Sequence, residues 1–336
     1  MGHHKDIQLS GIGSGIVDIL VDVTDQELKE LSIEKESYGE MSTEARTEIL
    51  HGLKGRTPVL VSGGSVANSM VTFAQLGGRG AFLCCLGDDR YGLHFAEEMG
   101  DFGLTIAAPK LVESATATVV SFVTPDGHRT MRVDWGVARR MCPEWVDTEI
   151  IARSQWLFIE GYLVAASPSV AAAALHAARE AKRHGTKVAI TCSETWVIEG
   201  FRAGLDAILE HCDLLFANAR EATCLTQQPD VLKAYAALAS RFENVVVTAG
   251  PEGAYVWYDN RKSHVKAFPC EPRDLTGAGD AMAGGFLYGI TNGYDPETSA
   301  RGGCKLAHEV IMRVGARLVT GAKEYWEHAA GLHSEA

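Results

Sequence analysis

The segment "DLTGAGDAMAGG", residues 274–285, places two aspartates on either side of a run of small residues and then continues as an apolar stretch. Consecutive Gly277, Ala278 and Gly279 let the backbone adopt conformations that are closed to larger side chains, so that successive N–H groups point into one hollow. A helix that begins near Gly279 adds the positive end of its dipole at the same place. The segment therefore predicts a phosphate-binding site at the start of a helix.

Asp280 lies on the rim of this predicted anion site, where a carboxylate does not help to bind an anion. It suits a group that orients a hydroxyl and accepts its proton while the hydroxyl attacks a bound phosphoryl group. The pattern therefore indicates a kinase. The alternative, from this segment alone, is a glycine-rich turn between strand and helix in which Asp280 caps the helix.

On both sides of this segment, short β-rich runs alternate with longer helical patterns, which is typical of a doubly wound sheet with helices on both faces. The predicted buried strands are 81–87, 156–161, 187–192, 213–218 and 244–250. The predicted helices are 66–77, 90–99, 167–185, 230–242, 279–290 and 295–314. We therefore predict an α/β fold with a mostly parallel sheet, in a single domain over residues 1–336.

Two regions do not follow this alternation. Residues 116–136 form two extended runs joined at Pro125, Asp126 and Gly127, which predicts a β-hairpin. The run 15–23 is also extended, and neither region has a helix partner of its own. We predict a small β lid, built from segments of about 15–45 and 112–137, that covers one end of the sheet.

The composition narrows the classes of partner. With 46% hydrophobic residues in 336, the chain can form a sizeable core, and a net charge of −12 argues against a nucleic-acid partner. We expect a small-molecule substrate. Eight cysteines without a CxxC pair, and no secretory leader at the start, predict a reducing cytoplasm. No apolar run approaches the ~20 residues of a membrane helix, so we expect no membrane association.

Other motifs of nucleotide and metal sites are incomplete. There is no GxxxxGK[ST] loop, and "PRDL" (272–275) lacks the His and the spaced Asn of a protein-kinase catalytic loop. "GIGSGI" (11–16) resembles a dinucleotide fingerprint, but Ile16 takes the place of the third glycine and a β-rich run follows. Cys304 and His308 have the i, i+4 spacing of two zinc ligands, but no further pair completes a site, and packing residues are the alternative.

Taken together, several separated motifs resemble the ribokinase-like carbohydrate kinases, or PfkB family, which includes the adenosine kinases. "DLTGAGD" matches the signature D-x-T-G-A-G-D of that family. The resemblance implies a ribokinase-like fold, Asp280 as the catalytic base, and an anion hole for the transferring phosphoryl group at Gly277, Ala278 and Gly279. It also implies that Asp274 and Thr276 help to bind a monovalent cation such as potassium.

Two further matches concern the substrate. "SGGSVANS" (62–69) and the downstream "LGDDRYG" (86–92) resemble the G-G-x-x-x-N signature, which implies a hinge at Gly63 and Gly64 and hydroxyl binding by Asn68. Asp18 matches an aspartate that pairs with two substrate hydroxyls, and a carboxylate can accept from both members of a diol. Without the resemblance, Asn68 is as well explained as a helix cap or solvent-facing residue, and Asp18 as an outward-facing strand residue.

The nucleotide side is matched by two motifs. Asn218 and Glu221 form the N-x-x-E pattern that organises magnesium-bound water and phosphate in the family. Thr248, Gly250 and Gly253 match T-x-G-x-x-G, which implies that they lie beside ATP. The resemblance therefore implies ATP and Mg²⁺ as cofactors.

The choice of acceptor is less well defined. Adenosine kinases often have G-N-x-x-x-D in the first strand, whereas this chain has Gly13 and Ser14. The N-terminal layout still favours a nucleoside such as adenosine, and sugar kinases of the ribokinase, fructokinase or keto-deoxygluconate type are the alternative. A non-catalytic sugar or nucleotide sensor is the alternative from another class, and a dinucleotide-dependent oxidoreductase is a weaker one. We expect a monomer or homodimer. Glu160 and Arg132 are expected to be ordinary surface residues, and the alternative is that both point toward the pocket.

Overall fold

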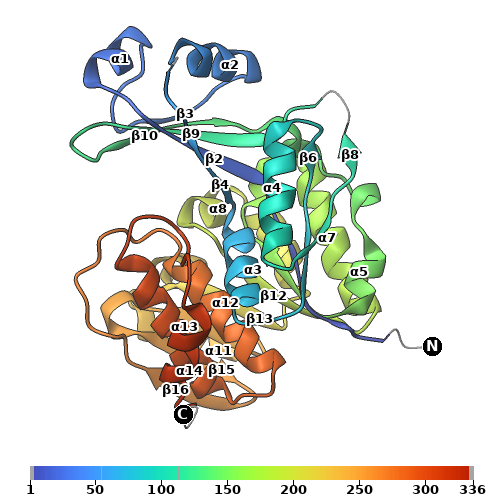
Figure 1. The fold of residues 1–336 in the computed structure, drawn as a ribbon. Coiled ribbons are helices and arrows are strands. Elements are labelled where there is room, and N and C mark those ends of the chain that lie inside the picture. Colours follow the sequence, from blue (N-terminus) through green and yellow to red (C-terminus); the bar gives the residue numbers. More distant parts are fainter. Residues whose placement is uncertain (1–3, 54, 112–113, 333–336) are drawn as a thin grey trace.

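The computed structural model describes residues 4–53, 55–111 and 114–332. Its centre is a nine-stranded sheet of order β16-β15-β14-β13-β12-β11-β1-β5-β7 (Figure 1). Neighbouring strands from β7 to β14 are parallel, and β15 and β16 are antiparallel additions at one edge. The strands are β1 (Ile7–Ile12), β5 (Gly80–Leu83), β7 (Thr105–Ala107), β11 (Ser154–Glu160), β12 (Lys187–Thr191), β13 (Leu214–Asn218), β14 (Val245–Thr248), β15 (Ala254–Tyr258) and β16 (Arg261–Val265).

Helices cover both faces of this sheet. One face packs against α5 (Thr148–Arg153), α7 (Pro168–Arg183), α8 (Thr195–Gly200), α9 (Arg202–Leu209), α10 (Ala219–Thr226) and α11 (Val231–Arg241). The other face packs against α3 (Ser65–Gln75), α4 (Arg90–Asp101), α12 (Ala278–Thr291) and α13 (Pro296–Ile311). The short α6 (Leu163–Ala166) precedes α7, and α14 (Ala322–Ala329) packs on α13.

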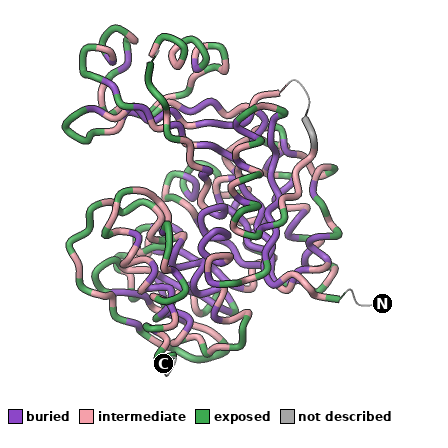
Figure 2. The backbone as a smooth tube through the Cα atoms, viewed as in Figure 1, coloured by how far each residue is buried: buried purple, intermediate pink, exposed green. Residues whose placement is uncertain are grey.

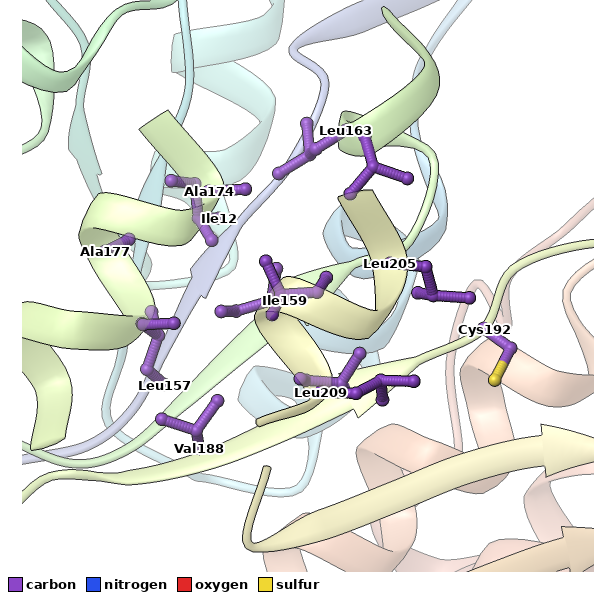
Figure 3. Close-up of a cluster of buried hydrophobic side chains, with 14 of the residues drawn as sticks. Ile12, Leu157, Ile159, Leu163, Ala174, Ala177, Val188, Cys192, Leu205 and Leu209 are labelled. Carbon is purple, nitrogen blue, oxygen red and sulfur yellow. The ribbon is translucent and has the colours of Figure 1, made fainter. Parts of the chain in front are cut away.

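Burial on both faces explains why the strands are almost continuously apolar. Successive residues of a strand point to opposite faces, so Leu157 and Ile159 of β11 lie in one core cluster while Trp156 and Phe158 lie in the other. Figure 3 shows the first cluster, where the β11 side chains meet Ala174 of α7. Figure 2 shows that the buried residues gather along this central sheet. Exposed residues lie on the outer helices and at the end of the molecule that carries α1 and α2 of Figure 1.

A second, five-stranded sheet has the order β3-β10-β9-β2-β4. Its strands are β2 (Ile16–Asp22), β3 (Tyr38–Glu40), β4 (Val59–Gly63), β9 (Ala117–Val123) and β10 (Arg129–Asp134). The antiparallel pairing of β9 with β10 confirms the predicted hairpin. The sheet stands at one end of the main body, with α1 (Asp25–Glu30) and α2 (Thr43–Gly52) at its outer side (Figure 1).

The strands of this second sheet lie in the two segments predicted for a lid, except β4, which belongs to neither. Residues 112–113 of the predicted second segment lie outside the described residues. β4 is important for the site because its last residue, Gly63, leads directly through Gly64 into α3. The second sheet is therefore joined to the main body at the predicted substrate motif.

One prediction about a strand was wrong. Residues 81–87 are not one strand, because the chain leaves the main sheet after Leu83 and forms the two-residue β6 (Leu86–Gly87), which pairs with β8 (Lys110–Leu111). There Gly87 packs against the backbone of the segment 114–116. The "GIGSGI" motif ends the central strand β1 and leads into β2, with no helix after it, which removes the dinucleotide alternative. In the part of the chain that the structure describes, no helix is long and apolar enough to span a membrane.

Candidate active site

The carboxyl ends of the parallel strands bring several predicted site residues to one edge of the sheet. Glu160, Asn218 and Thr248 are the last residues of β11, β13 and β14. In register, Asn218 lies beside Thr248. Open α/β sheets bind their ligands beyond this edge. The structure therefore places these three residues where a ligand site is expected.

The predicted phosphate site lies at the start of α12. Gly277 precedes the helix with φ of 80°, and a Cβ atom there would lie 2.1 Å from the carbonyl oxygen of Ala316, so only glycine fits. Gly279 is exposed, and a Cβ atom built on it meets no other atom within 4 Å. The N–H groups of a first helical turn have no partner within the helix. This turn can therefore bind an anion from the open side of Gly279.

Asp280 is fixed by side chains from the predicted substrate motif. Ser65 Oγ donates a hydrogen bond of 2.6 Å to one carboxylate oxygen, and Asn68 Nδ2 donates one of 2.9 Å to the other. Asn68 is buried, and its Oδ1 accepts a bond of 2.7 Å from Nε of Arg317. The alternative of Asn68 as a helix cap or solvent-facing residue is therefore wrong. Ser65 and Arg317 carry no signal in the sequence motifs and were missed.

The surroundings of Asp280 make it a stronger base than an ordinary aspartate. Burial raises the pKa of its carboxyl to about 6, against the opposing effects of the hydrogen bonds from Ser65 and Asn68 and of the Arg317 charge. A base works best when its pKa lies near the working pH. The carboxylate therefore combines a fixed orientation with a useful proton affinity.

Asp18 lies on β2, next to β4. Its Oδ2 is 2.7 Å from the position that a Cβ atom would take on Gly63, so the carboxylate lies directly against this glycine. Gly64 has φ of 102°, and a Cβ atom there would lie 2.6 Å from the carbonyl oxygen of Ser14. Burial raises the pKa of Asp18 to about 6, and the charges of Arg317 and Arg129 oppose the shift. Asp18 thus lies directly against the glycine pair that leads into α3, the helix that carries Asn68.

The prediction of Glu160 as a surface residue was wrong. Its exposure is 1%, and its carboxylate accepts hydrogen bonds from the backbone N–H of Val66 (3.1 Å) and from Ser14 Oγ (3.2 Å). Burial raises the pKa of Glu160 to about 7, and the charge of Asp280 adds to the shift. Its place at the end of the apolar run "WLFIE" is the signal that points to the sheet edge. Arg132, in contrast, is partly exposed and donates to Ser37, the residue before β3.

Asn218 and Glu221 form a reciprocal capping box at the start of α10. Asn218 Oδ1 accepts from the N–H of Glu221 at 2.9 Å, and Glu221 Oε2 accepts from the N–H of Asn218 at 3.0 Å. Burial raises the pKa of Glu221 to about 7, with further contributions from the charges of Glu194 and Asp280. The motif therefore has a structural role and also adds negative charge near Asp280.

These carboxylates suit a hard cation that keeps its water. Across residues 4–53, 55–111 and 114–332, no three or more His, Cys, Asp or Glu side chains are grouped to hold a metal ion. The carboxylate of Glu221 is a ligand of the type that magnesium prefers.

A cavity of about 460 Å³ opens beside the first turn of α12. It brings Thr248, Gly250 and Gly253 together with Ala278 and Gly279, whereas Asn218 is not among its lining residues. Much of its wall is apolar and comes from residues without a motif, namely Ala267, Phe268, Pro269, Met282, Ala307 and Ile311. The cavity thus joins the predicted ATP motif to the predicted anion site.

Cys304 and His308 also line this cavity. A ring nitrogen of His308 lies 3.2 Å from the carbonyl oxygen of Phe268, and Cys304 is buried. No third ligand joins them in the described part of the chain. The structure therefore favours packing and cavity lining over zinc binding for this pair.

Asp274 and Thr276 lie together in the loop before α12. Asp274 Oδ1 accepts from the N–H and the hydroxyl of Thr276 (3.0 and 2.6 Å), and Oδ2 accepts from the N–H of Gly315 (3.0 Å). Nη2 of Arg129, on β10 of the second sheet, lies 3.9 Å from the same Oδ2. The second sheet therefore reaches the loop that precedes the anion site.

Comparison with known families matches residues 36–321 to the pfkB family carbohydrate kinases. The chain belongs to this family. It is therefore an ATP-dependent kinase, and its architecture is the ribokinase-like α/β fold with a mostly parallel sheet flanked by helices.

Solved structures and sequence relatives of this PfkB-family kinase agree with that assignment. A probable sugar kinase from Rhizobium etli is similar with a TM-score of 0.83 and 31% identity, over 98% of this chain and 100% of that one. An adenosine kinase from Sinorhizobium meliloti gives 0.82 and 32%, over 96% and 99% of the two chains. The adenosine kinase of Saccharomyces cerevisiae is 26% identical over 326 residues, which cover 90% of this chain and 94% of the relative.

Proposed function

We propose that this PfkB-family kinase transfers the γ-phosphoryl group of ATP to a primary hydroxyl of a nucleoside such as adenosine, with Asp280 as the catalytic base. The observation that carries the proposal is the position of Asp280, which lies in the open first turn of α12 and accepts hydrogen bonds from Ser65 and Asn68 of α3. The likeness to an adenosine kinase over nearly the whole chain supports the nucleoside. The glycine conformations at the start of α12 and the carboxylate of Asp280 support phosphoryl transfer, but by themselves they do not identify the acceptor.

On the donor side, the cavity beside α12 accommodates the nucleotide. Its apolar walls, with Phe268 among them, suit a purine ring, and Thr248, Gly250 and Gly253 also line it. The phosphates then extend toward Gly277, Ala278 and Gly279, where the first turn of α12 receives negative charge. The γ-phosphoryl group comes to lie in front of Asp280.

On the acceptor side, Asp18 accepts hydrogen bonds from two hydroxyls while the backbone at Gly63 and Gly64 approaches the ring. The primary hydroxyl donates its proton to the carboxylate of Asp280. Its oxygen forms a bond to the γ-phosphorus as the bond from this phosphorus to the β–γ bridging oxygen breaks, and ADP leaves. Alignment and charge supply most of the acceleration, and the base contributes about 10²- to 10⁴-fold.

Magnesium bound with ATP neutralises charge on the phosphates. Asn218 and Glu221 would hold this ion through its water ligands, and the charge of Asp280 acts on Glu221. The monovalent cation at Asp274 and Thr276 stays a prediction of the resemblance. We derive no step through it, because the Asp274 carboxylate already accepts three protein hydrogen bonds and faces Arg129. Activity in potassium, sodium and choline chlorides at equal ionic strength tests it.

A sugar as acceptor is the second candidate. The likeness to a probable sugar kinase favours it, and the diol-binding position of Asp18 suits a sugar ring as well as a ribose. A sensor without catalysis is less well supported, since the Asp280 base and its hydrogen bonds are intact. We further propose that the second sheet acts as a lid over the acceptor, in a monomer or homodimer, and that the eight free cysteines reflect a cytoplasmic setting.

ADP release from Mg-ATP tests the proposal, with adenosine, cytidine, ribose, fructose and keto-deoxygluconate as acceptors. We expect strong release with adenosine and little without an acceptor. A maximum with a sugar would select the second candidate instead. Silence over the whole panel from folded protein, as judged by a cooperative thermal transition, would contradict the phosphotransferase proposal for these acceptors.

A further inference from the structure

Arg317 is buried in the site with part of its guanidinium unused. It lies in the segment between α13 and α14, and its side chain is 8% exposed. Nε donates to Asn68 Oδ1 at 2.7 Å, whereas Nη1 is 3.6 Å from Glu98 Oε1, beyond hydrogen-bonding distance. Nη1 and Nη2 have no hydrogen-bond partner among the described residues. Buried donors without partners are costly, so these two groups indicate a missing ligand.

The position of Arg317 is fixed from two sides. The carbonyl oxygen of the preceding Ala316 lies against Gly277, at the start of α12. Glu98, on α4, uses its other oxygen to accept from the N–H and the hydroxyl of Ser62 at 2.7 and 2.6 Å, one residue before Gly63. The guanidinium is therefore held between the anion site and the glycine pair of the acceptor site.

The charges around Arg317 decide which ligand fits. Arg317 is linked to Asp280 through Asn68. Its neighbour Glu98 accepts from Ser62, the residue before Gly63, against which Asp18 lies. The Arg317 charge opposes the rise in the pKa of both aspartates. Glu98 is a third carboxylate beside it, and Glu160 is a fourth, on which the charge of Asp280 acts. Arg129 also acts on Asp18. Two guanidiniums beside the four carboxylates of Asp18, Asp280, Glu98 and Glu160 still leave the acceptor site negative, which opposes an acceptor with its own carboxylate or phosphate.

The hydrogen-bonding capacity of the pair formed by Arg317 and Asp18 matches a diol. Each hydroxyl of a diol donates one hydrogen bond and accepts others. An ionised aspartate only accepts and a guanidinium only donates, so the two side chains together satisfy both halves of each hydroxyl. Asp18 alone leaves the hydroxyl oxygens without a donor.

We propose that Arg317 is a specificity-determining residue that donates, through Nη1 and Nη2, to the oxygens of a vicinal diol whose protons are accepted by Asp18. The kinase thereby selects uncharged acceptors that carry this diol, and it discriminates against sugar acids. This inference rests on the proposed phosphoryl transfer and narrows the class of its acceptor. A contact of Arg317 with the transferring phosphoryl group is the competing outcome.

Steady-state kinetics of Arg317→Met and Arg317→Lys test the proposal, with adenosine and 2′-deoxyadenosine, or ribose and 2-deoxyribose if ribose is the acceptor found. We expect Arg317→Met to raise the KM of the diol acceptor by about 10- to 100-fold, the loss of one or two charge-assisted hydrogen bonds. The KM of ATP should change less than about twofold by comparison. Arg317→Lys keeps the positive charge but lacks the paired donors of the guanidinium. Its KM for the diol acceptor should therefore lie between those of the wild type and Arg317→Met.

The deoxy acceptor separates binding from a structural effect. If Arg317 contacts the hydroxyls, Arg317→Met should cost roughly tenfold less with the deoxy acceptor than with the diol, because one bond is already absent. Arg313→Met is the matched control: this arginine lies four residues earlier, its side chain is 37% exposed, and it pairs with Glu309 on the surface. It should leave both KM values unchanged.

Three results would overturn the proposal. If Arg317→Met raises KM equally for the diol and the deoxy acceptor, Arg317 only orients Asn68. If only the KM of ATP rises, Arg317 contacts the phosphoryl group. A preference of the wild-type kinase for keto-deoxygluconate over neutral acceptors would also overturn the proposal. This result needs no variant, so it can be obtained even if Arg317→Met does not fold. Absence of ADP release from wild type with every acceptor would instead count against the proposed function.

Discussion

Nδ2 of Asn68 donates a hydrogen bond of 2.9 Å to the carboxylate of Asp280, across 212 positions of the chain. Arg317 donates to the oxygen of the same amide, so the amide can turn only its nitrogen toward Asp280. Ser65 donates to the second carboxylate oxygen. The orientation of the proposed base is therefore set by the glycine-pair motif and by the segment after α13.

Asp280→Asn removes the proton acceptor but keeps the shape of the side chain. We expect turnover to fall by about 10²- to 10⁴-fold, with ATP and acceptor affinities changed by less than about fivefold. ADP release and calorimetric titration measure the two effects. The control Asp101→Asn lies on the exposed end of α4 and should behave as wild type. Turnover near the wild-type value in Asp280→Asn would refute the assignment of the base.

The activity should depend on pH through two carboxylates. Asp18 and Asp280 have pKa values raised to about 6, and each is active only when ionised. As the pH falls below about 6, both become protonated, so kcat/KM for the acceptor should drop by ten- to a hundredfold per pH unit. A profile from pH 4.5 to 8.5 at saturating ATP measures this. A constant kcat/KM down to pH 5 would contradict the assigned roles.

Glu160 should make the fold more stable in mild acid. Its pKa is about 7 in the folded protein against an ordinary 4.5, so the folded protein keeps a proton that the unfolded chain has lost. The free energy of unfolding from this group therefore falls as the pH rises from about 4.5 to 7, by at most about 3 kcal/mol. Glu160→Gln should raise Tm at pH 8 relative to wild type and have less effect at pH 5.

Thermal unfolding at these two values of pH measures the difference. The exposed Glu48 on α2 provides the control, because Glu48→Gln should not change the pH dependence of Tm. A Glu160→Gln protein that loses stability more at pH 8 than at pH 5 would show that the ionised carboxylate stabilises the fold through its hydrogen bonds.

Gly64→Ala should damage both the fold and the acceptor site. The backbone at Gly64 has φ of 102°, and the added Cβ atom would lie 2.6 Å from the carbonyl oxygen of Ser14, which is backbone and cannot move alone. We expect a loss of about 1–3 kcal/mol in stability and a higher acceptor KM. Gly100→Ala, within α4 and with no atom within 4 Å, should instead be neutral or stabilise by up to about 1 kcal/mol. Equal effects of the two substitutions on Tm would contradict the steric argument.

Gly279→Val should block the phosphates without disturbing the fold. No atom lies within 4 Å of a Cβ at this position, so the valine is accommodated by the protein but occupies the space beside the first turn of α12. ATP affinity should fall by roughly tenfold or more, while the affinity for the acceptor alone stays as in wild type. Calorimetric titration with ATP and with the acceptor, each alone, measures the two affinities separately. Unchanged ATP affinity would place the phosphates elsewhere.

Local chemistry explains which parts of the site could be predicted. The anion site depends on backbone freedom at Gly277 to Gly279, which the sequence displays directly. Arg317 was missed because its role comes from contacts with Asn68 and Glu98, far away in the chain. Glu160 was placed on the surface because an apolar run does not show whether its last residue faces solvent or a neighbouring helix. Glu160, at the end of β11, faces α3, where the N–H of Val66 donates to its carboxylate.

The fold shows the same limit. Runs of Val, Ile, Leu and Phe identified strands such as β11 and β13 because both faces of the sheet are covered. The central strand β1 escaped notice because its last residues belong to a glycine-rich motif with another interpretation. The single strand predicted over 81–87 is two strands, because pairing with β8 depends on a segment more than twenty residues away and not on local pattern.

The hydrogen bonds to Asp280 also have a consequence for synthesis of the protein. Ser65 and Asn68 leave the ribosome early, whereas Asp280 and Arg317 are added near the end of translation. A nascent chain that has already formed its glycine-pair motif therefore has neither the base nor the guanidinium. By the proposed mechanism, premature termination before residue 280 yields a product that lacks the base for phosphoryl transfer.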